Sequence, residues 1–146
     1  MKKLFEYNEI ESLALFIRRL NYEADSGALV IVEGQRDTNA LRSLGFEGEL
    51  FLLCQNKSFT KLITTALSYK KVIVLFDLDT KGDSLTKKVV LLLQKDTIID
   101  LHFRRELLKA TRGKVRHIEE LNRYVEYLQT PIEKLHIFHP TSANNK

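Results

Sequence analysis

Residues 28–37 read ALVIVEGQRD and residues 72–82 read VIVLFDLDTKG, and these two stretches decide the fold. Each opens with five apolar residues, most of them β-branched, and then turns to acidic residues and a glycine. A short run that is apolar at every position is typical of a parallel β-strand with both faces buried. The two stretches therefore predict two strands of a parallel sheet, each with polar residues at its carboxyl end.

A third apolar run lies between these stretches, at residues 50–54 (LFLLC), and a weaker one follows them, at 97–99 (TII). Between the runs, apolar residues recur at three- and four-residue steps within 37–44, 58–69 and 83–95, which indicates helices. This alternation predicts an α/β fold: a Rossmann-like open parallel sheet of about four strands with helices on both faces.

Helices are also expected at both ends of the chain. An amphipathic pattern over residues 4–24 predicts an N-terminal helix, and residues 101–138 are expected to form a C-terminal helical extension. We find no linker or internal repeat, so we expect one domain over residues 1–146 with a core at about 27–100.

Composition excludes several classes of protein. The 146 residues include 23 basic and 19 acidic side chains, a net charge of +4, and 44% hydrophobic residues, as in ordinary globular proteins. No apolar run exceeds five residues, whereas a membrane-spanning helix needs ~20, so no membrane partner is expected. Acidic residues break the apolar stretch that a signal peptide would need within residues 1–11, so we expect no signal peptide there.

A single cysteine, Cys54, excludes an internal disulfide, and we expect it in the core of a cytoplasmic protein.

Three carboxylates follow the two strongest strands. In open α/β sheets, ligands bind at the carboxyl ends of the strands, and there we expect Glu33, Asp77 and Asp79 to meet if the two strands are neighbours. Carboxylates packed together repel one another, and a divalent cation such as Mg²⁺ relieves the repulsion. Gly34 and Gly82 allow tight turns and leave room for a substrate phosphate.

The same residues allow a simpler interpretation. An acid that follows a strand is commonly a helix cap, and we assign this role to Asp37 and Asp83. A single Asp-x-Asp sequence is about as common in a solvated loop as in a metal site. The combination of Glu-Gly with Asp-x-Asp-x-x-Gly ~40 residues later favours the metal site.

This combination resembles the Toprim domain, which is shared by primases, topoisomerases, overcoming-lysogenization-defect nucleases and small ribonucleases that mature ribosomal RNA. Three residues match the first Toprim motif: Glu33, Gly34 and Asp37. Three others match the second: Asp77, Asp79 and Gly82. The resemblance covers about residues 27 to 100, and the later segment GKVRHIEEL is similar to what small stand-alone archaeal Toprim proteins carry after the core.

The resemblance implies a role for each residue. Glu33 would be a general acid or base, or a member of the metal shell, while Asp77 and Asp79 would hold Mg²⁺, with Mn²⁺ as a substitute. The implied reaction is phosphodiester cleavage or phosphoryl transfer on nucleic acid, with RNA slightly favoured over DNA. Some Toprim members carry a third acid where this chain has Lys81, so a second metal ion is not implied.

Basic residues concentrate after the last predicted strand. Six lie between Asp100 and His117: Arg104, Arg105, Lys109, Arg112, Lys114 and Arg116. Such residues can hold phosphates without reading sequence, although a solvated helix face would look the same. The candidate phosphate contacts are Arg36, Lys81, Arg104, Arg105 and Arg112.

Two alternative functions stay open. One is a non-catalytic nucleic-acid-binding or adaptor module that works with a protein partner. The other is a haloacid-dehalogenase-like phosphatase with Asp77 as nucleophile, which fits poorly because it leaves Glu33 without a role. His136 and His139 lack a third ligand in the sequence and are interpreted as surface or packing residues.

Overall fold

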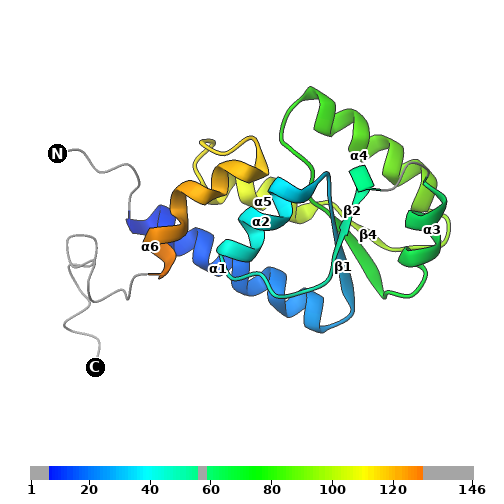
Figure 1. The fold of residues 1–146 in the computed structure, drawn as a ribbon, viewed down its shortest axis with the longest axis horizontal. Coiled ribbons are helices and arrows are strands. Elements are labelled where there is room, and N and C mark those ends of the chain that lie inside the picture. Colours follow the sequence, from blue (N-terminus) through cyan, green and yellow to red (C-terminus); the bar gives the residue numbers. More distant parts are fainter. Residues whose placement is uncertain (1–6, 56–58, 130–146) are drawn as a thin grey trace.

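The computed structural model describes residues 7–55 and 59–129, and these form a parallel sheet covered by helices on both faces (Figure 1). The strands, in the spatial order β2-β1-β3-β4, are β1 (Ala28–Val32), β2 (Leu50–Leu52), β3 (Lys71–Val74) and β4 (Ile99–Asp100). All neighbouring strands are parallel. The predicted α/β architecture is thus confirmed.

Strand β1 lies in the middle of the sheet because all five of its residues can be buried. Its Ile31 is in register with Val74 of β3 and with Phe51 of β2. The ladder continues past β3, where the Leu75 amide donates to the Ile31 carbonyl oxygen at 2.9 Å. Since β1 and β3 are direct neighbours, the residues that follow them reach the same edge of the sheet.

Helices connect the strands and extend both ends of the described chain. The α-helices are α1 (Tyr7–Asp25), α2 (Gln35–Ser43), α3 (Thr60–Ala66), α4 (Thr80–Leu93), α5 (His102–Ala110) and α6 (Val125–Gln129), and the 3₁₀ helices are η1 (Leu53–Gln55) and η2 (Ile118–Tyr124). No helix within these described ranges is long and apolar enough to cross a membrane.

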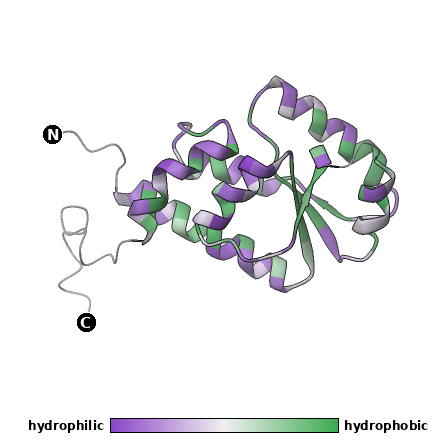
Figure 2. Ribbon diagram, in the orientation of Figure 1, coloured by the Kyte–Doolittle hydropathy of each residue, from purple (hydrophilic) through white to green (hydrophobic). Residues whose placement is uncertain are grey.

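The sheet separates two apolar layers. Ala28, Val30 and Val32 of β1 face a core shared with α1, α2, α5 and η2. Leu29 and Ile31 face the opposite core, which α3 and α4 cover. Hydrophobic colour is concentrated in the strands, whereas most helices alternate between hydrophilic and hydrophobic residues (Figure 2). This pattern is that of a sheet buried on both sides by amphipathic helices.

Some predicted boundaries are wrong. The 50–54 run leaves the extended conformation after Leu52, and Cys54 is exposed in η1 instead of lying in the core. The last strand is shifted from 97–99 to Ile99–Asp100, since Ile98 is exposed. Within the helical extension expected over residues 101–138, the part after α5 forms the 3₁₀ helix η2 and the short helix α6.

Parts of the sequence-based predictions fall outside the described residues. These are the first residues of the expected N-terminal helix (4–6), residue 58, and the end of the C-terminal extension (130–138) with His136 and His139.

A buried polar contact joins α1 to the C-terminal part of the described chain. The Glu9 side chain is fully buried, and its Oε1 lies 2.9 Å from the Lys114 ammonium nitrogen. The Tyr124 hydroxyl donates to Glu9 Oε2. Burial, reinforced by the bond to the Glu9 carboxylate, raises the pKa of Tyr124 above its ordinary value, so the phenol stays protonated as a donor.

Candidate functional site

Asp77 stands at the centre of the acidic edge, three residues after β3 ends. Its carboxylate Oδ1 accepts a hydrogen bond from the Ile118 amide at 2.8 Å, across 41 residues of sequence. Partial burial raises the pKa of Asp77, while the Ile118 amide and the nearby His117 act against that rise. Asp77 is therefore a half-buried carboxylate held by the segment that follows α5.

Glu33 lies beside Asp77 because β1 and β3 are neighbours. Its Oε2 accepts a hydrogen bond from the Asp77 backbone amide at 3.1 Å. The sequence-based expectation that the two stretches meet at one sheet edge is thus reflected in this contact.

Asp79 begins helix α4. It has extended backbone angles (φ −138°, ψ 179°), and its Oδ1 accepts a hydrogen bond from the Gly82 amide at 2.7 Å, as an N-cap does. The prediction of Asp83 as the cap is therefore wrong. Because α4 starts at Thr80, Asp83 falls inside the first turn, where it pairs with Arg104 at 2.7 Å.

Asp37 is in the first turn of α2, which begins after Gly34. Its Oδ2 accepts a hydrogen bond from the Gly34 amide at 3.3 Å, so it assists the cap from the third helical position and is not itself the cap residue. Burial, followed by repulsion from Asp77, raises the pKa of Asp37 from 3.8 to about 6.

His117 completes a cluster that the sequence did not reveal. Ligand atoms of Asp77, Asp79 and His117 all lie within 4.8 Å of one another, and His117 Nε2 is 3.2 Å from Asp79 Oδ2. Burial alone would lower the pKa of His117, but the surrounding carboxylates, Asp77 first among them, raise it. His117 lies 38 positions after Asp79 in the sequence, so no local spacing links the two; the nearest signal is the GKVRHIEEL segment.

The segment around His117 is attached directly to the loop that carries the aspartates. The Leu78 amide donates to the Arg116 carbonyl oxygen at 2.5 Å, and the Arg116 guanidinium donates to the Leu78 carbonyl oxygen at 3.4 Å. Together with the bond from the Ile118 amide to Asp77, these contacts make residues 116–118 one wall of the site.

Glycine is required at position 82. A Cβ atom there would lie 1.8 Å from the Asp77 carbonyl oxygen, far inside van der Waals contact. This close approach, and not an unusual φ angle, explains the glycine of the second motif.

Arg104 supports the same loop from α5. Its guanidinium donates to the Phe76 carbonyl oxygen at 3.0 Å and to the Asp77 carbonyl oxygen, and it pairs with Asp83. The Arg104 side chain is only 14% exposed. The guanidinium predicted to contact a substrate phosphate is thus directed into the protein, where it holds the backbone of the site.

The other predicted phosphate contacts are exposed. Arg36 is 86% exposed and lies 3.7 Å from the Glu119 carboxylate. Lys81 is in the first turn of α4, Arg105 is on α5, and Arg112 follows α5 with a positive φ of 54°. Arg36 also lines a hollow of about 370 Å³ beside Glu120, together with Arg123.

The donor set fits a divalent cation. Two carboxylates and one imidazole offer the oxygen and nitrogen ligands that such ions accept. Ligands on opposite sides of one ion are separated by ~4 to 5 Å for bonds of ~2.0 to 2.5 Å, which is comparable with the spacing of this cluster. Glu33 lies outside the three-residue cluster and adjoins it through the Asp77 amide.

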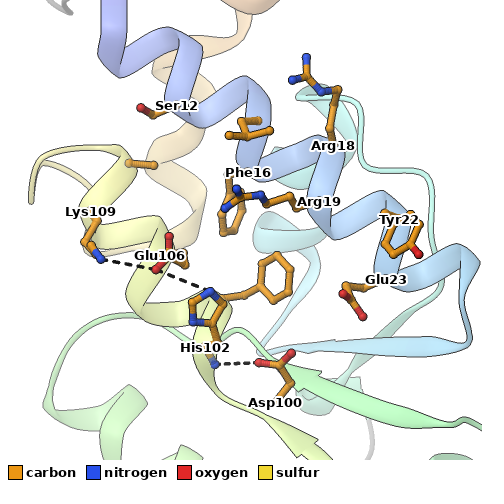
Figure 3. A pocket seen from close by; sticks show the side chains of 13 residues that line it. Ser12, Phe16, Arg18, Arg19, Tyr22, Glu23, Asp100, His102, Glu106 and Lys109 are labelled. Atoms are coloured by element: carbon orange, nitrogen blue, oxygen red, sulfur yellow. Dashed lines mark hydrogen bonds and ion pairs between the residues drawn. The ribbon is translucent and has the colours of Figure 1, made fainter.

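A larger groove of about 700 Å³ lies between α1 and α5 (Figure 3). Aromatic and basic side chains line it, among them Tyr22, Arg19 and Lys109. The Glu106 carboxylate in this groove already contacts Lys109 at 3.7 Å and His102 at 3.6 Å. Since no residue that lines the groove belongs to the acidic cluster, the groove contributes nothing to that site.

Comparisons with known proteins agree with this geometry. The family model described as Toprim domain matches residues 28–115, more than half of the chain. A UPF0292 protein of Thermococcus sibiricus is 34% identical over 116 residues, which cover 79% of this chain and 86% of that protein. A UPF0292 protein of Archaeoglobus fulgidus is 32% identical over 113 residues, with 75% and 86% coverage.

A solved structure shares the fold. The structure of a protein from Aquifex aeolicus superposes with a TM-score of 0.63 at 31% identity, covering 74% of this chain and 96% of that one. Toprim domains typically bind divalent metals and act on nucleic acids. With the motif residues at one edge of the parallel sheet and the family model matched across it, the chain belongs to the Toprim domain family.

Proposed function

We propose that this protein is a divalent-metal-dependent enzyme that cleaves or transfers phosphodiesters of nucleic acid, with RNA as the preferred substrate. The observation that carries the proposal is the pairing of Asp77 and Asp79, whose ligand atoms share a 4.8 Å cluster, with Glu33 hydrogen-bonded to the Asp77 amide. A metal-binding pair of carboxylates beside a third carboxylate supplies both charge stabilisation and proton transfer. The preference for RNA rests on the similarity in size to Toprim ribonucleases.

In this proposal Asp77 and Asp79 hold Mg²⁺, which supplies Lewis-acid stabilisation of a phosphoryl oxygen when bound. Both carboxylates are oriented before any ion binds, Asp77 by the Ile118 amide and Asp79 by the Gly82 amide. Each of those bonds uses Oδ1, and Asp79 Oδ2 lies 3.2 Å from His117 Nε2. The protein thus fixes the direction of both acids at little cost in side-chain entropy on binding.

Glu33 moves the proton in the proposed reaction. Its Oε2 is bonded to the Asp77 amide, and the other carboxylate oxygen, Oε1, would exchange the proton with the reacting group. For hydrolysis, a water oxygen forms the new bond to phosphorus, its proton passes to Glu33, and the ester oxygen leaves with its electron pair and is protonated. The same carboxyl group can return the proton to the leaving oxygen.

Basic side chains around the site would hold the nucleic-acid backbone. Arg36 follows Glu33 by three residues, Lys81 follows Asp79 by two, and Arg116 contacts Leu78 between the two aspartates. Contacts to phosphate position a nucleic acid without selecting its sequence. We therefore expect cleavage with weak sequence preference and strong dependence on salt.

Cleavage assays on labelled single- and double-stranded RNA and DNA, with Mg²⁺ or Mn²⁺ titrated from zero, test the proposal. We expect Glu33→Gln to lower the rate by at least about 100-fold, the lower range of a general acid–base contribution. We expect Asp77→Asn to lower the rate as well, because the metal loses a charged ligand. Asp96→Asn is the matched control, because Asp96 is exposed and lies before β4, at the opposite end of the strands.

Three results would decide against parts of the proposal. Cleavage unchanged by both Glu33→Gln and Asp77→Asn would exclude this site. Nucleic-acid binding that persists in EDTA and survives Glu33→Gln, without cleavage of any substrate, would identify a binding or adaptor module. Hydrolysis of a small phosphomonoester, lost in Asp77→Asn, would instead support a phosphatase.

A further inference from the structure

His117 reaches the acidic cluster from outside the part of the chain that carries both Toprim motifs. The family match ends at residue 115, and His117 is the residue before η2. Its Nε2 is 3.2 Å from Asp79 Oδ2, and it shares the 4.8 Å cluster with Asp77 as well. The side chain is 49% exposed, so solvent reaches the ring from the open side of the site.

Backbone contacts on both sides of His117 fix the position from which its side chain extends. The neighbouring Ile118 is fully buried, and its amide is bonded to Asp77 Oδ1 at 2.8 Å. On the other side, Arg116 exchanges hydrogen bonds with the backbone of Leu78. Residue 117 is therefore held on both flanks against the loop that carries Asp77 and Asp79.

Glu120 supports the ring from behind. Its Oε1 accepts hydrogen bonds from the amides of Arg116 and His117 at 3.0 and 3.1 Å, and its Oε2 lies 3.8 Å from His117 Nδ1. One ring nitrogen thus faces the aspartates and the other faces a carboxylate. This is the arrangement in which a metal-binding histidine is oriented by an acid on its far side.

We propose that His117 is the third protein ligand of the metal and that it makes the site prefer a first-row transition-metal dication over Mg²⁺. The inference rests on the metal site of the proposed function and deepens it. Mg²⁺ favours oxygen ligands, whereas imidazole nitrogen binds first-row transition metals better, with affinity rising from Mn²⁺ to Co²⁺. A donor set of two carboxylates and one imidazole therefore discriminates between these ions more strongly than an all-carboxylate set would.

Calorimetric titration of the metal-free full chain with Mg²⁺, Mn²⁺ and Co²⁺, without nucleic acid, tests this. We expect Co²⁺ to bind more tightly than Mn²⁺ and Mn²⁺ more tightly than Mg²⁺. His117→Asn should weaken Co²⁺ and Mn²⁺ binding by about 10-fold or more and Mg²⁺ binding by less than about 3-fold. His102→Asn is the matched control, since His102 is an exposed histidine on α5 that contacts Glu106.

Three further measurements keep the test independent of folding and of catalysis. His117→Glu replaces nitrogen by oxygen and should shift the preference back toward Mg²⁺ if the side chain is a ligand. The visible absorption of bound Co²⁺ reports nitrogen ligation directly, and should change in His117→Asn but not in His102→Asn. Far-ultraviolet circular dichroism identifies any variant that fails to fold.

The outcomes separate the two proposals. If His117→Asn lowers the affinity for all three ions equally, or for none of them, the proposed role of His117 is overturned. The metal-dependent reaction is unaffected by that result. Absence of binding of every ion by the wild type overturns both. Binding that depends on His117 without cleavage of any nucleic acid overturns the proposed reaction alone.

Discussion

Asp37 is a buried acid whose ionisation opposes folding. It is 7% exposed, lies in the first turn of α2, and experiences the charges of Asp77 and Glu33. Burial and these charges raise its pKa to about 6. Its cap bond to Gly34 offsets only part of this effect.

The sign of the pH dependence follows from the direction of this shift. Between the unfolded pKa of 3.8 and the folded pKa of about 6, the folded protein binds more protons, so stability falls as pH rises through this window. Asp37→Asn keeps an oxygen acceptor for the Gly34 amide and removes the charge. At pH 8 we expect the metal-free variant to be more stable than the wild type by about 1 to 2 kcal/mol, after allowance for solvent screening. Below pH ~4, where Asp37 is protonated in both states, the removed charge should give no difference in stability.

Urea unfolding at pH 4, 6 and 8 in EDTA measures this difference. The exposed Asp25, at the end of α1, provides the control Asp25→Asn, which should show no such trend. A stability difference that stays constant from pH 4 to pH 8 would contradict the assignment.

The positions of site residues could be predicted where they depend on signals that are local in the sequence. Glu33 and the two aspartates directly follow apolar runs, so their placement at one sheet edge could be inferred before the structure was known. His117 could not, because its position depends on how residues 111–118 pack against the loop after β3. Asp83 was misassigned because the position of a cap depends on where a helix begins, to within a few residues.

At the level of elements, Arg104 connects α5 to the loop between β3 and α4. Its guanidinium bonds the carbonyl oxygens of Phe76 and Asp77 and the carboxylate of Asp83. A planar group with five donors suits this task, and lysine would not reproduce it. The helix therefore holds the segment in which both aspartates of the proposed metal site lie.

Arg104→Gln should loosen this segment. We expect the free energy of unfolding to fall by about 1 to 3 kcal/mol, since charge-assisted bonds to partly buried groups are lost, and metal affinity to fall with it. Arg105→Gln changes the exposed neighbour on the same helix and should alter neither quantity. Chemical unfolding and calorimetric metal titration measure the two effects. If Arg104→Gln weakened only nucleic-acid binding, Arg104 would be a phosphate contact after all.

The main elements of the sheet were predictable because four apolar runs and the helical periods between them are local signals. Their ends were not. Residues 72–76 are buried throughout, yet strand β3 ends at Val74, and only the bond from the Leu75 amide to the Ile31 carbonyl oxygen extends the ladder beyond it. The sequence of the 3₁₀ helix η2 shows no regular apolar repeat that would predict it. Its capping by Glu120 could be seen only in the structure.

Across the whole molecule, the Glu9–Lys114–Tyr124 contact joins residues more than 100 positions apart. Glu9 is fully buried, whereas Lys114 is 39% exposed, so the pair lies at the margin of the core. Removing one member of such a pair leaves the other without its main partner. The contact fixes α1 against the part of the chain that leads into residues 116–118.

Glu9→Gln should lower the free energy of unfolding by about 2 to 4 kcal/mol, toward the lower end for a buried pair because Lys114 is partly solvated. Glu11→Gln is the matched control, because Glu11 is exposed on the same helix. Thermal and urea unfolding at pH 7 measure both variants. Equal stability of Glu9→Gln and the wild type would show that the buried carboxylate is dispensable.

The net charge of the whole molecule was a poor guide to its function. A total of +4 does not distinguish nucleic-acid-binding proteins from others, whereas the positions of the charges do. Acids gather at the carboxyl edge of the sheet, and exposed bases lie close to them in the sequence, Arg36 three residues after Glu33 and Lys81 two residues after Asp79. The sequence predicted separate acidic and basic regions. It did not predict that one base, Arg104, would bind the backbone of the loop that carries the aspartates.

Because residues 116–118 are attached to the aspartate loop, the site depends on residues that lie beyond the matched Toprim segment. The family match ends at residue 115, one position before the wall of the site begins. A segment excised or grafted at that boundary would carry both motifs but would expose Asp77 to solvent and leave it without its amide donor. The smallest segment that would keep the proposed metal site together therefore extends past the matched Toprim residues, through the turn that carries His117 and Ile118.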